Sequence, residues 1–110
     1  MDNIKNDEYF VEKILIDLHF ISKHMDGVSM ETLEQDEIFL NAMMFRLIQI
    51  WENARKLSDD YKKHHRTIPW VDIAGLRNRL VHDYGNVDLK VVYLTLAEDV
   101  PMLIKELEKL

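Results

Sequence analysis

The chain has 110 residues, of which 47% are hydrophobic and 31% charged, a balance typical of a folded globular protein rather than a disordered or membrane-embedded one. Its formal net charge of -6 excludes a protein that coats nucleic acid indiscriminately, because such binding needs many Lys and Arg contacts. The absence of cysteine excludes disulfides, thiol nucleophiles and cysteine-based zinc sites.

The start of the chain lacks the basic residues and apolar run of a secretion signal, and no apolar stretch reaches membrane-spanning length. The acidic balance also disfavours binding to an anionic membrane surface. We therefore expect a cytoplasmic protein without membrane contact, folded as one domain over residues 1–110.

The first predicted helix covers residues 7–25, where apolar side chains recur at steps of four and three and fall on one stripe. These side chains are Phe10, Ile14, Leu18, Ile21 and Met25. Gly27 ends this helix, and residues 29–35 form a connector with about one helical turn.

The second predicted helix, residues 36–57, is apolar over most of its circumference. Its apolar residues are Ile38, Phe39, Leu40, Met43, Met44, Phe45, Leu47, Ile48, Ile50, Trp51, Ala54 and Leu57. A helix of this kind must be covered on two sides, so it is either central in the bundle or part of a subunit interface. In so small a domain we favour the interface. The polar strip with Glu52 and Asn53 then either borders a cleft or forms a contact between subunits.

The third predicted helix begins after Ser58, which serves as N-cap before two acidic residues, and it ends in the basic run 62–66. A fourth helix opens with Pro69 in its first turn and runs to about His82 or Tyr84. Asp88 caps the last helix, which extends to about Lys109.

Pro101 lies inside that last helix, so we expect a kink or break near residues 99 and 100. The fold class predicted from these elements is all-α, an up-and-down bundle of four to five helices.

The segment 77–84 gathers chemically active side chains at the end of the fourth helix: Arg77, Asn78, His82 and Tyr84. Asn78 and His82 share a helix face, whereas Arg77 and His82 are separated by roughly 140 degrees on a regular helix. Both can therefore act on one atom only if the helix loosens before Gly85, or if a second copy of the chain contributes its own Arg and His.

An Arg and a His without metal ligands suit RNA cleavage through the 2'-hydroxyl. His82 serves as general base or acid, and Arg77 binds the scissile phosphate and stabilises the transition state. DNA lacks the nucleophile, and no metal or cofactor is required. By spacing alone, a surface cluster that compensates the helix dipole is the more common explanation of these residues.

Further RNA contacts are assigned to Arg79, Lys62 and Lys63. Each has a simpler explanation, since Arg79 can pair with Asp83 at i,i+4 and the two lysines belong to the basic end of a helix, which is commonly just solvated.

The string Arg-x-x-x-x-His-x-Tyr at 77–84 resembles the signature of HEPN domains in the HepT-like toxin family. The similarity extends over residues 52–58, 68–70, 75–84 and 99–101, in the same order. Trp51 stands where the family usually has Gly, which affects local packing and not the motif.

The resemblance implies a homodimeric ribonuclease toxin with the Arg and His of both protomers in a shared cleft. It further implies a partner, a minimal nucleotidyltransferase antitoxin, which transfers AMP from ATP to Tyr84 and thereby silences the enzyme.

Two other functions stay open. The chain could be a noncatalytic helical subunit that binds nucleotides or presents substrate to a nucleotidyltransferase, or a plain dimerisation module.

Overall fold

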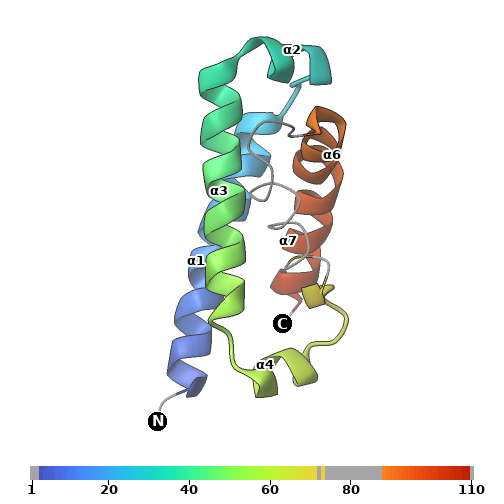
Figure 1. Ribbon diagram of the computed structural model, residues 1–110. Coiled ribbons are helices and arrows are strands. Elements are labelled where there is room, and N and C mark those ends of the chain that lie inside the picture. Colours follow the sequence, from blue (N-terminus) through green and yellow to red (C-terminus); the bar gives the residue numbers. More distant parts are fainter. Residues whose placement is uncertain (1–2, 72, 74–87, 110) are drawn as a thin grey trace.

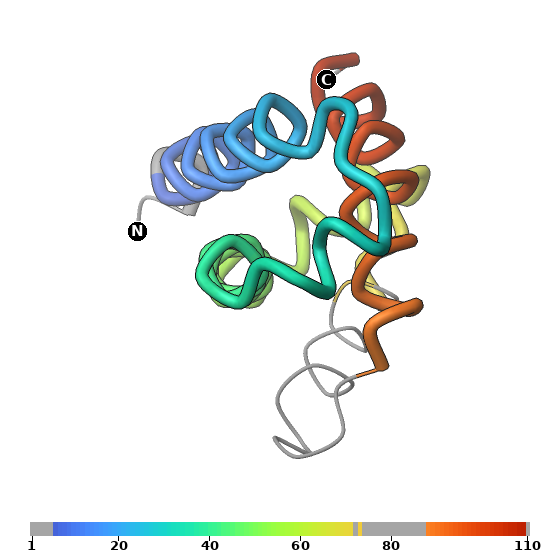
Figure 2. Tube along the Cα trace, turned by 90° about the horizontal axis from the view of Figure 1, so that it is seen from above, coloured from blue at the N-terminus to red at the C-terminus, as the bar shows by residue number. Residues whose placement is uncertain are grey.

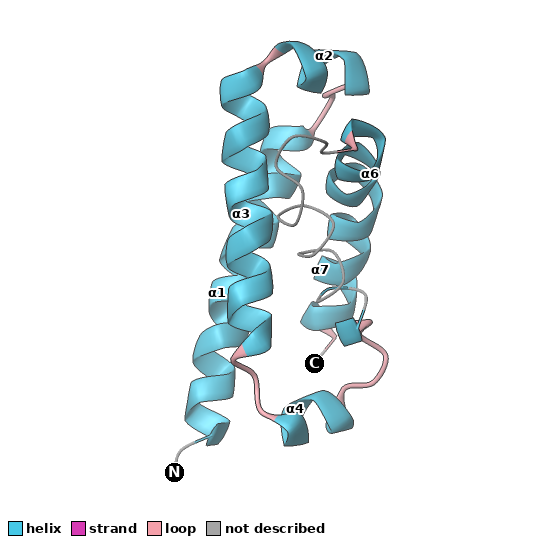
Figure 3. Ribbon diagram, in the orientation of Figure 1, coloured by secondary structure: helices cyan, strands magenta, loops and turns pink. Residues whose placement is uncertain are grey.

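A computed structural model describes residues 3–71, 73 and 88–109 of the chain, and this described part contains helices and no strand (Figure 3). The elements are α1 (Asn3–Met25), α2 (Met30–Gln35), α3 (Glu37–Arg55), α4 (Asp59–His64), α6 (Leu89–Leu94), the π-helix η1 (Thr95–Asp99) and α7 (Val100–Glu108). The predicted all-α class is thereby confirmed for the described residues.

The long helices α1 and α3 lie side by side and run in opposite directions, with α2 at one end of the pair and α4 at the other (Figure 1). α1 also packs against η1 and α7. Seen from above, α1, α3 and the α6–α7 stretch form three corners of the molecule (Figure 2). α1 is therefore the element that joins the other two long segments.

The apolar stripe of α1 forms one wall of the core. Ile14, Leu18 and Ile21 are at most 1% exposed, and Met25 is also buried. The predicted stripe is confirmed, although the helix begins at Asn3, four residues before the expected start. Gly27, with φ of +74°, follows the end of the helix, as predicted, because glycine adopts this conformation without strain.

The connector before α3 is more helical than its sequence indicated. Ser29 caps the six-residue helix α2 by accepting a hydrogen bond from the Thr32 amide, and Asp36 caps α3 by accepting one from the Phe39 amide. These two short polar side chains satisfy amides at the helix starts. α3 can therefore follow α2 with only Asp36 between them.

α3 buries only one of its apolar faces within the chain. Met43, Leu47, Ile50 and Ala54 face the core, but Ile38 is 84% exposed. Phe45 is also mostly exposed, at 58%. Part of the surplus of apolar residues noted in the sequence thus lies on the surface. Whether this part belongs to a subunit interface stays a prediction.

The C-terminal helix changes geometry before its proline. Asp88 caps α6 through the amides of Lys90 and Val91, as predicted. The Val100 amide donates to the Thr95 carbonyl five residues back, which makes η1 a π-helical turn. Pro101 has no N–H and cannot continue the regular pattern, so the predicted disturbance near residues 99 and 100 takes this form.

A buried ion pair joins α1 to α3. Arg46 donates to Asp17 at 2.8 Å, and its guanidinium lies 3.8 Å from the centre of the Phe20 ring. Asp17 is only 5% exposed, so its charge needs this partner. The contact fixes the position of α3 along the length of α1.

Within the described residues, no helix is both long enough and apolar enough to cross a membrane.

We predict that Ile14→Ala lowers the free energy of unfolding by about 2–5 kcal/mol, because it leaves a cavity in the core. Ile16→Ala is the matched control: it removes the same atoms from the same helix, but Ile16 is 56% exposed. Its effect should stay within about 0.5 kcal/mol. Urea unfolding followed by circular dichroism measures both, and equal losses would contradict the assigned core.

Candidate functional site

The predicted catalytic and regulatory residues Arg77, Asn78, His82 and Tyr84, together with Arg79, lie outside the described residues. What the structure describes is the segment that leads toward them, from the end of α3 through α4 to residue 73. Of the predicted RNA-contacting residues, Lys62 and Lys63 belong to this segment.

α4 begins as the sequence predicted. Ser58 Oγ accepts a hydrogen bond from the Tyr61 amide at 3.1 Å, which satisfies a free amide of the first turn. Lys62 and Lys63 lie in the last turn, Lys63 exposed and Lys62 half-buried. Neither lysine forms an ion pair with another residue in the described part of the chain. Their charges are therefore available to an anion in solvent.

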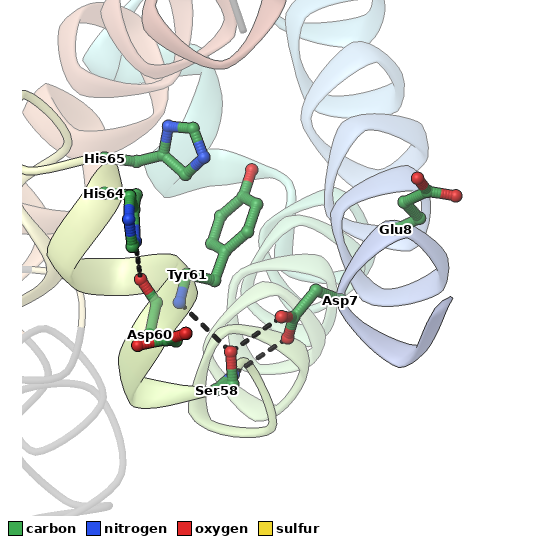
Figure 4. Close-up of a pocket in the computed structure, with 7 residues that line it drawn as sticks. All are labelled: Asp7, Glu8, Ser58, Asp60, Tyr61, His64 and His65. Carbon is green, nitrogen blue, oxygen red and sulfur yellow. Dashed lines mark hydrogen bonds between the residues drawn. The ribbon is translucent and has the colours of Figure 1, made fainter. Parts of the chain in front are cut away.

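Asp7 of α1 holds the start of α4. Its two carboxylate oxygens accept hydrogen bonds from the Ser58 amide at 2.8 Å and the Ser58 hydroxyl at 2.7 Å (Figure 4). Asp7 is 6% exposed. A buried carboxylate that accepts two short hydrogen bonds forms a strong link between elements 51 residues apart.

An aromatic cluster anchors the chain after α4. The rings of Tyr61 and His65 lie 4.2 Å apart, and Trp70 meets Tyr61 edge-on at 6.1 Å. Trp70 Nε1 donates to the His65 carbonyl at 3.0 Å, and Ile68 between them is buried. These contacts make Trp70 a packing anchor and fasten the start of the fourth predicted helix to α4.

The environment of Tyr61 disfavours its ionised form. Burial raises the pKa of the Tyr61 phenol above its usual value, and the negative charge of Asp7 raises it further. Tyr61 therefore stays a neutral packing and stacking group at physiological pH.

A cavity of about 360 Å³ lies between α4 and the start of α1. Its walls are Asp7, Glu8, Ser58, Asp60, Tyr61, His64 and His65, and Figure 4 shows Glu8 directed away from the other side chains. His64 Nδ1 is hydrogen-bonded to the Asp60 carbonyl at 2.7 Å. Among the described residues, no three His, Asp or Glu side chains are arranged to hold a metal ion.

Part of the polar strip of α3 forms an ion pair within the same helix. Glu52 lies 3.8 Å from Arg55, whose guanidinium is 5.2 Å from the centre of the Trp51 ring. Arg55 remains 65% exposed at its side chain. Whether the strip borders a cleft or contacts another subunit stays a prediction.

Sequence reasoning missed Asp7 as a structural residue, although a signal was present. Asp7 and Asp17 both fall on the apolar stripe of α1, at helical spacings from Ile14. An acidic residue on a buried stripe indicates a paired or hydrogen-bonded carboxylate. Spacing could not name the partner.

The fold is a helical bundle. In the part that the structure describes, α4 has a basic last turn, and aromatic contacts fasten α4 to the chain that leads toward the Arg-His-Tyr motif. A family model described as Ribonuclease HepT-like matches residues 14–110, and the chain belongs to this family. The match includes α4 and the whole motif, and it confirms the resemblance drawn from the sequence.

Curated relatives cover nearly the whole chain. One from Caldanaerobacter subterraneus subsp. tengcongensis is 27% identical over 97% of this chain and 96% of its own. One from Thermococcus cleftensis is 31% identical over 92% of each chain, and one from Methanocaldococcus jannaschii is 32% identical over 84% of this chain and 86% of its own. Their names are "Putative RNase", "Probable ribonuclease HepT" and "Putative RNase", respectively. No solved structure gives a significant match.

Proposed function

We propose that this chain is a metal-independent endoribonuclease toxin that cleaves RNA through the 2'-hydroxyl. The observation that carries the proposal is the HepT-like family match over residues 14–110, which contains Arg77, His82 and Tyr84 in the spacing of the family motif. The site of action is the cytoplasm, and the functional unit is the single domain 1–110.

In the proposed reaction the 2'-oxygen of a ribose attacks the adjacent phosphorus, and the bond to the 5'-oxygen of the next nucleotide breaks. His82 removes the 2'-hydroxyl proton or protonates the leaving oxygen, because an imidazole can gain or lose a proton near neutral pH. Arg77 stabilises the charge on the pentavalent phosphorus, and Asn78 completes the site as a hydrogen-bonding group. The products are a 2',3'-cyclic phosphate and a free 5'-hydroxyl.

The RNA backbone is bound by cations beyond the motif, namely Lys62, Lys63 and Arg79. Residues 55–66 contain five Lys or Arg and two Asp, although the chain as a whole carries a net charge of -6. The exposure of Lys63 and the absence of ion pairs at both lysines within the described residues support this role. A local basic surface on an acidic protein favours RNA held at one place over indiscriminate coating.

The second copy that completes the site joins through α3. Ile38 and Phe45 lie two turns apart on one side of this helix and are 84% and 58% exposed. Ile48, one turn beyond Phe45, is half-buried. An apolar stripe of this length is costly in water, and a two-fold axis beside it would pair the stripe with itself.

Regulation acts through Tyr84 and a partner, a minimal nucleotidyltransferase antitoxin. The Tyr84 oxygen attacks the α-phosphorus of ATP, pyrophosphate leaves, and the phenolic proton is released. The resulting phosphodiester adds a negative charge beside Arg77 and fills the space that RNA needs.

We predict that Arg77→Ala and His82→Ala each reduce RNA cleavage by about 100-fold or more, because each removes a group that acts in the transition state. Cleavage of a labelled RNA in EDTA measures this. His19→Ala is the matched control. This histidine is exposed, pairs with Glu108, and lies far from the motif in the sequence. Full activity of both motif variants would point to a noncatalytic subunit or a dimerisation module.

We predict that Phe45→Lys converts the dimer into a monomer, because it places charges inside the proposed apolar interface. Light scattering coupled to gel filtration measures the mass. Met102→Lys serves as control, since Met102 is a similarly exposed apolar residue, 50% exposed, on α7. A wild-type monomer, or a dimer that persists in Phe45→Lys, would contradict the assigned interface.

We predict that coexpression with a minimal nucleotidyltransferase of the proposed kind raises the intact mass of the chain by one or more AMP groups and suppresses cleavage. Tyr84→Phe should abolish the mass increase, and Tyr93→Phe, a tyrosine whose hydroxyl donates to the Val28 carbonyl, should not. An increase that survives in Tyr84→Phe would exclude this residue as the acceptor.

A further inference from the structure

We propose that Asp7 is a positioning residue for RNA binding: it holds α4 through Ser58 and thereby sets where Lys62 and Lys63 meet the phosphate backbone. This inference rests on the proposed function and adds to it a residue of α1, distant in sequence from both the motif and α4.

The geometry forms a continuous chain of hydrogen bonds. Asp7 accepts from the amide and the hydroxyl of Ser58, at 2.8 Å and 2.7 Å, and the same hydroxyl oxygen accepts from the Tyr61 amide at 3.1 Å. The carboxylate thus orients the side chain that caps α4 and fixes the backbone at its start. Figure 4 shows the three groups in this order.

α4 depends on such contacts because it is short. A helix of six residues is far below the length that is stable by itself in water, so its orientation comes from the residues that fasten its ends. Asp7 holds the first end, and the contact of Tyr61 with His65 and Trp70 holds the other. Lys62 and Lys63 lie between the two attachments.

Among the described residues, Asp7 is held by hydrogen bonds to Ser58 and not by an ion pair. Within the described residues it forms no ion pair with Lys, Arg or His. Asp17, the other buried acidic residue of α1, pairs with Arg46 of α3. Asp7 is 6% exposed and Asp17 is 5% exposed, so the two carboxylates are equally buried. They differ in the helix that each one contacts.

Asp7→Asn tests the inference, with Asp17→Asn as matched control for loss of a buried carboxylate on the same helix. The asparagine keeps the shape but has one acceptor oxygen: the Ser58 amide can still donate to it, whereas the Ser58 hydroxyl must accept from the new amide N–H. Both charge-assisted hydrogen bonds thus become weaker neutral ones. Ser58→Ala should reproduce its effect, and Ser58→Thr, which keeps a capping hydroxyl, should restore wild-type behaviour.

The first readout is binding of the full-length protein to a 2'-O-methyl RNA that cannot be cleaved, measured over a salt series. Each lost phosphate contact should reduce the slope of log K against log salt by about 0.7. We expect Asp7→Asn and Ser58→Ala to lower the slope by about 0.7–1.4 and to weaken binding several-fold at low salt. Asp17→Asn should leave the slope unchanged even where it lowers the melting temperature.

The second readout is amide hydrogen exchange, which needs no RNA. Asp7→Asn should speed exchange in residues 59–66 and leave the middle of α3 as in wild type. Unchanged exchange in α4, or a salt slope that Asp7→Asn and Asp17→Asn alter equally, would overturn the inference and leave the ribonuclease proposal intact. A wild-type protein that neither binds nor cleaves RNA would instead overturn the proposed function, while exchange still decides whether Asp7 holds α4.

Discussion

The packing of α1 against its neighbours is the constraint on which the rest of the structure depends. Its buried stripe faces the core, and two buried carboxylates on the same helix reach different elements. Asp17 binds Arg46 and fixes α3, whereas Asp7 binds Ser58 and fixes the start of α4. One helix therefore orients both the apolar surface proposed for dimerisation and the basic helix proposed for RNA binding.

Charge distribution reconciles an acidic protein with an RNA substrate. The net charge of -6 lowers nonspecific attraction to nucleic acid, while residues 55–66, with five Lys or Arg and two Asp, carry a local excess of positive charge. Cleavage through the 2'-hydroxyl needs only a proton-transfer group and a cation at the phosphate. A small helical domain without a metal site in its described part can supply both, provided that two copies complete one cleft.

Local signals in the sequence predicted much of the fold, whereas contacts between residues far apart in the sequence could not be predicted. The caps at Ser58 and Asp88 were predictable because each depends on a few neighbouring residues. The partner of Asp7 is 51 residues away, and no periodicity encodes such a pairing. The disturbance before Pro101 was predictable from the missing N–H, but the sequence did not show that it takes the form of a π-helical turn packed against α1. The motif was identified by its family resemblance, since spacing alone favours a surface cluster.

The central claim is that the 2'-hydroxyl of RNA is the nucleophile and that no metal takes part. An RNA oligonucleotide that contains a mapped cleavage position, and its twin with a single 2'-deoxyribose at that position, test this directly in EDTA. The account predicts cleavage of the first with a 2',3'-cyclic phosphate end, and no cleavage of the second at that position. Equal cleavage of both, or cleavage that appears only when a divalent metal is added, would contradict it.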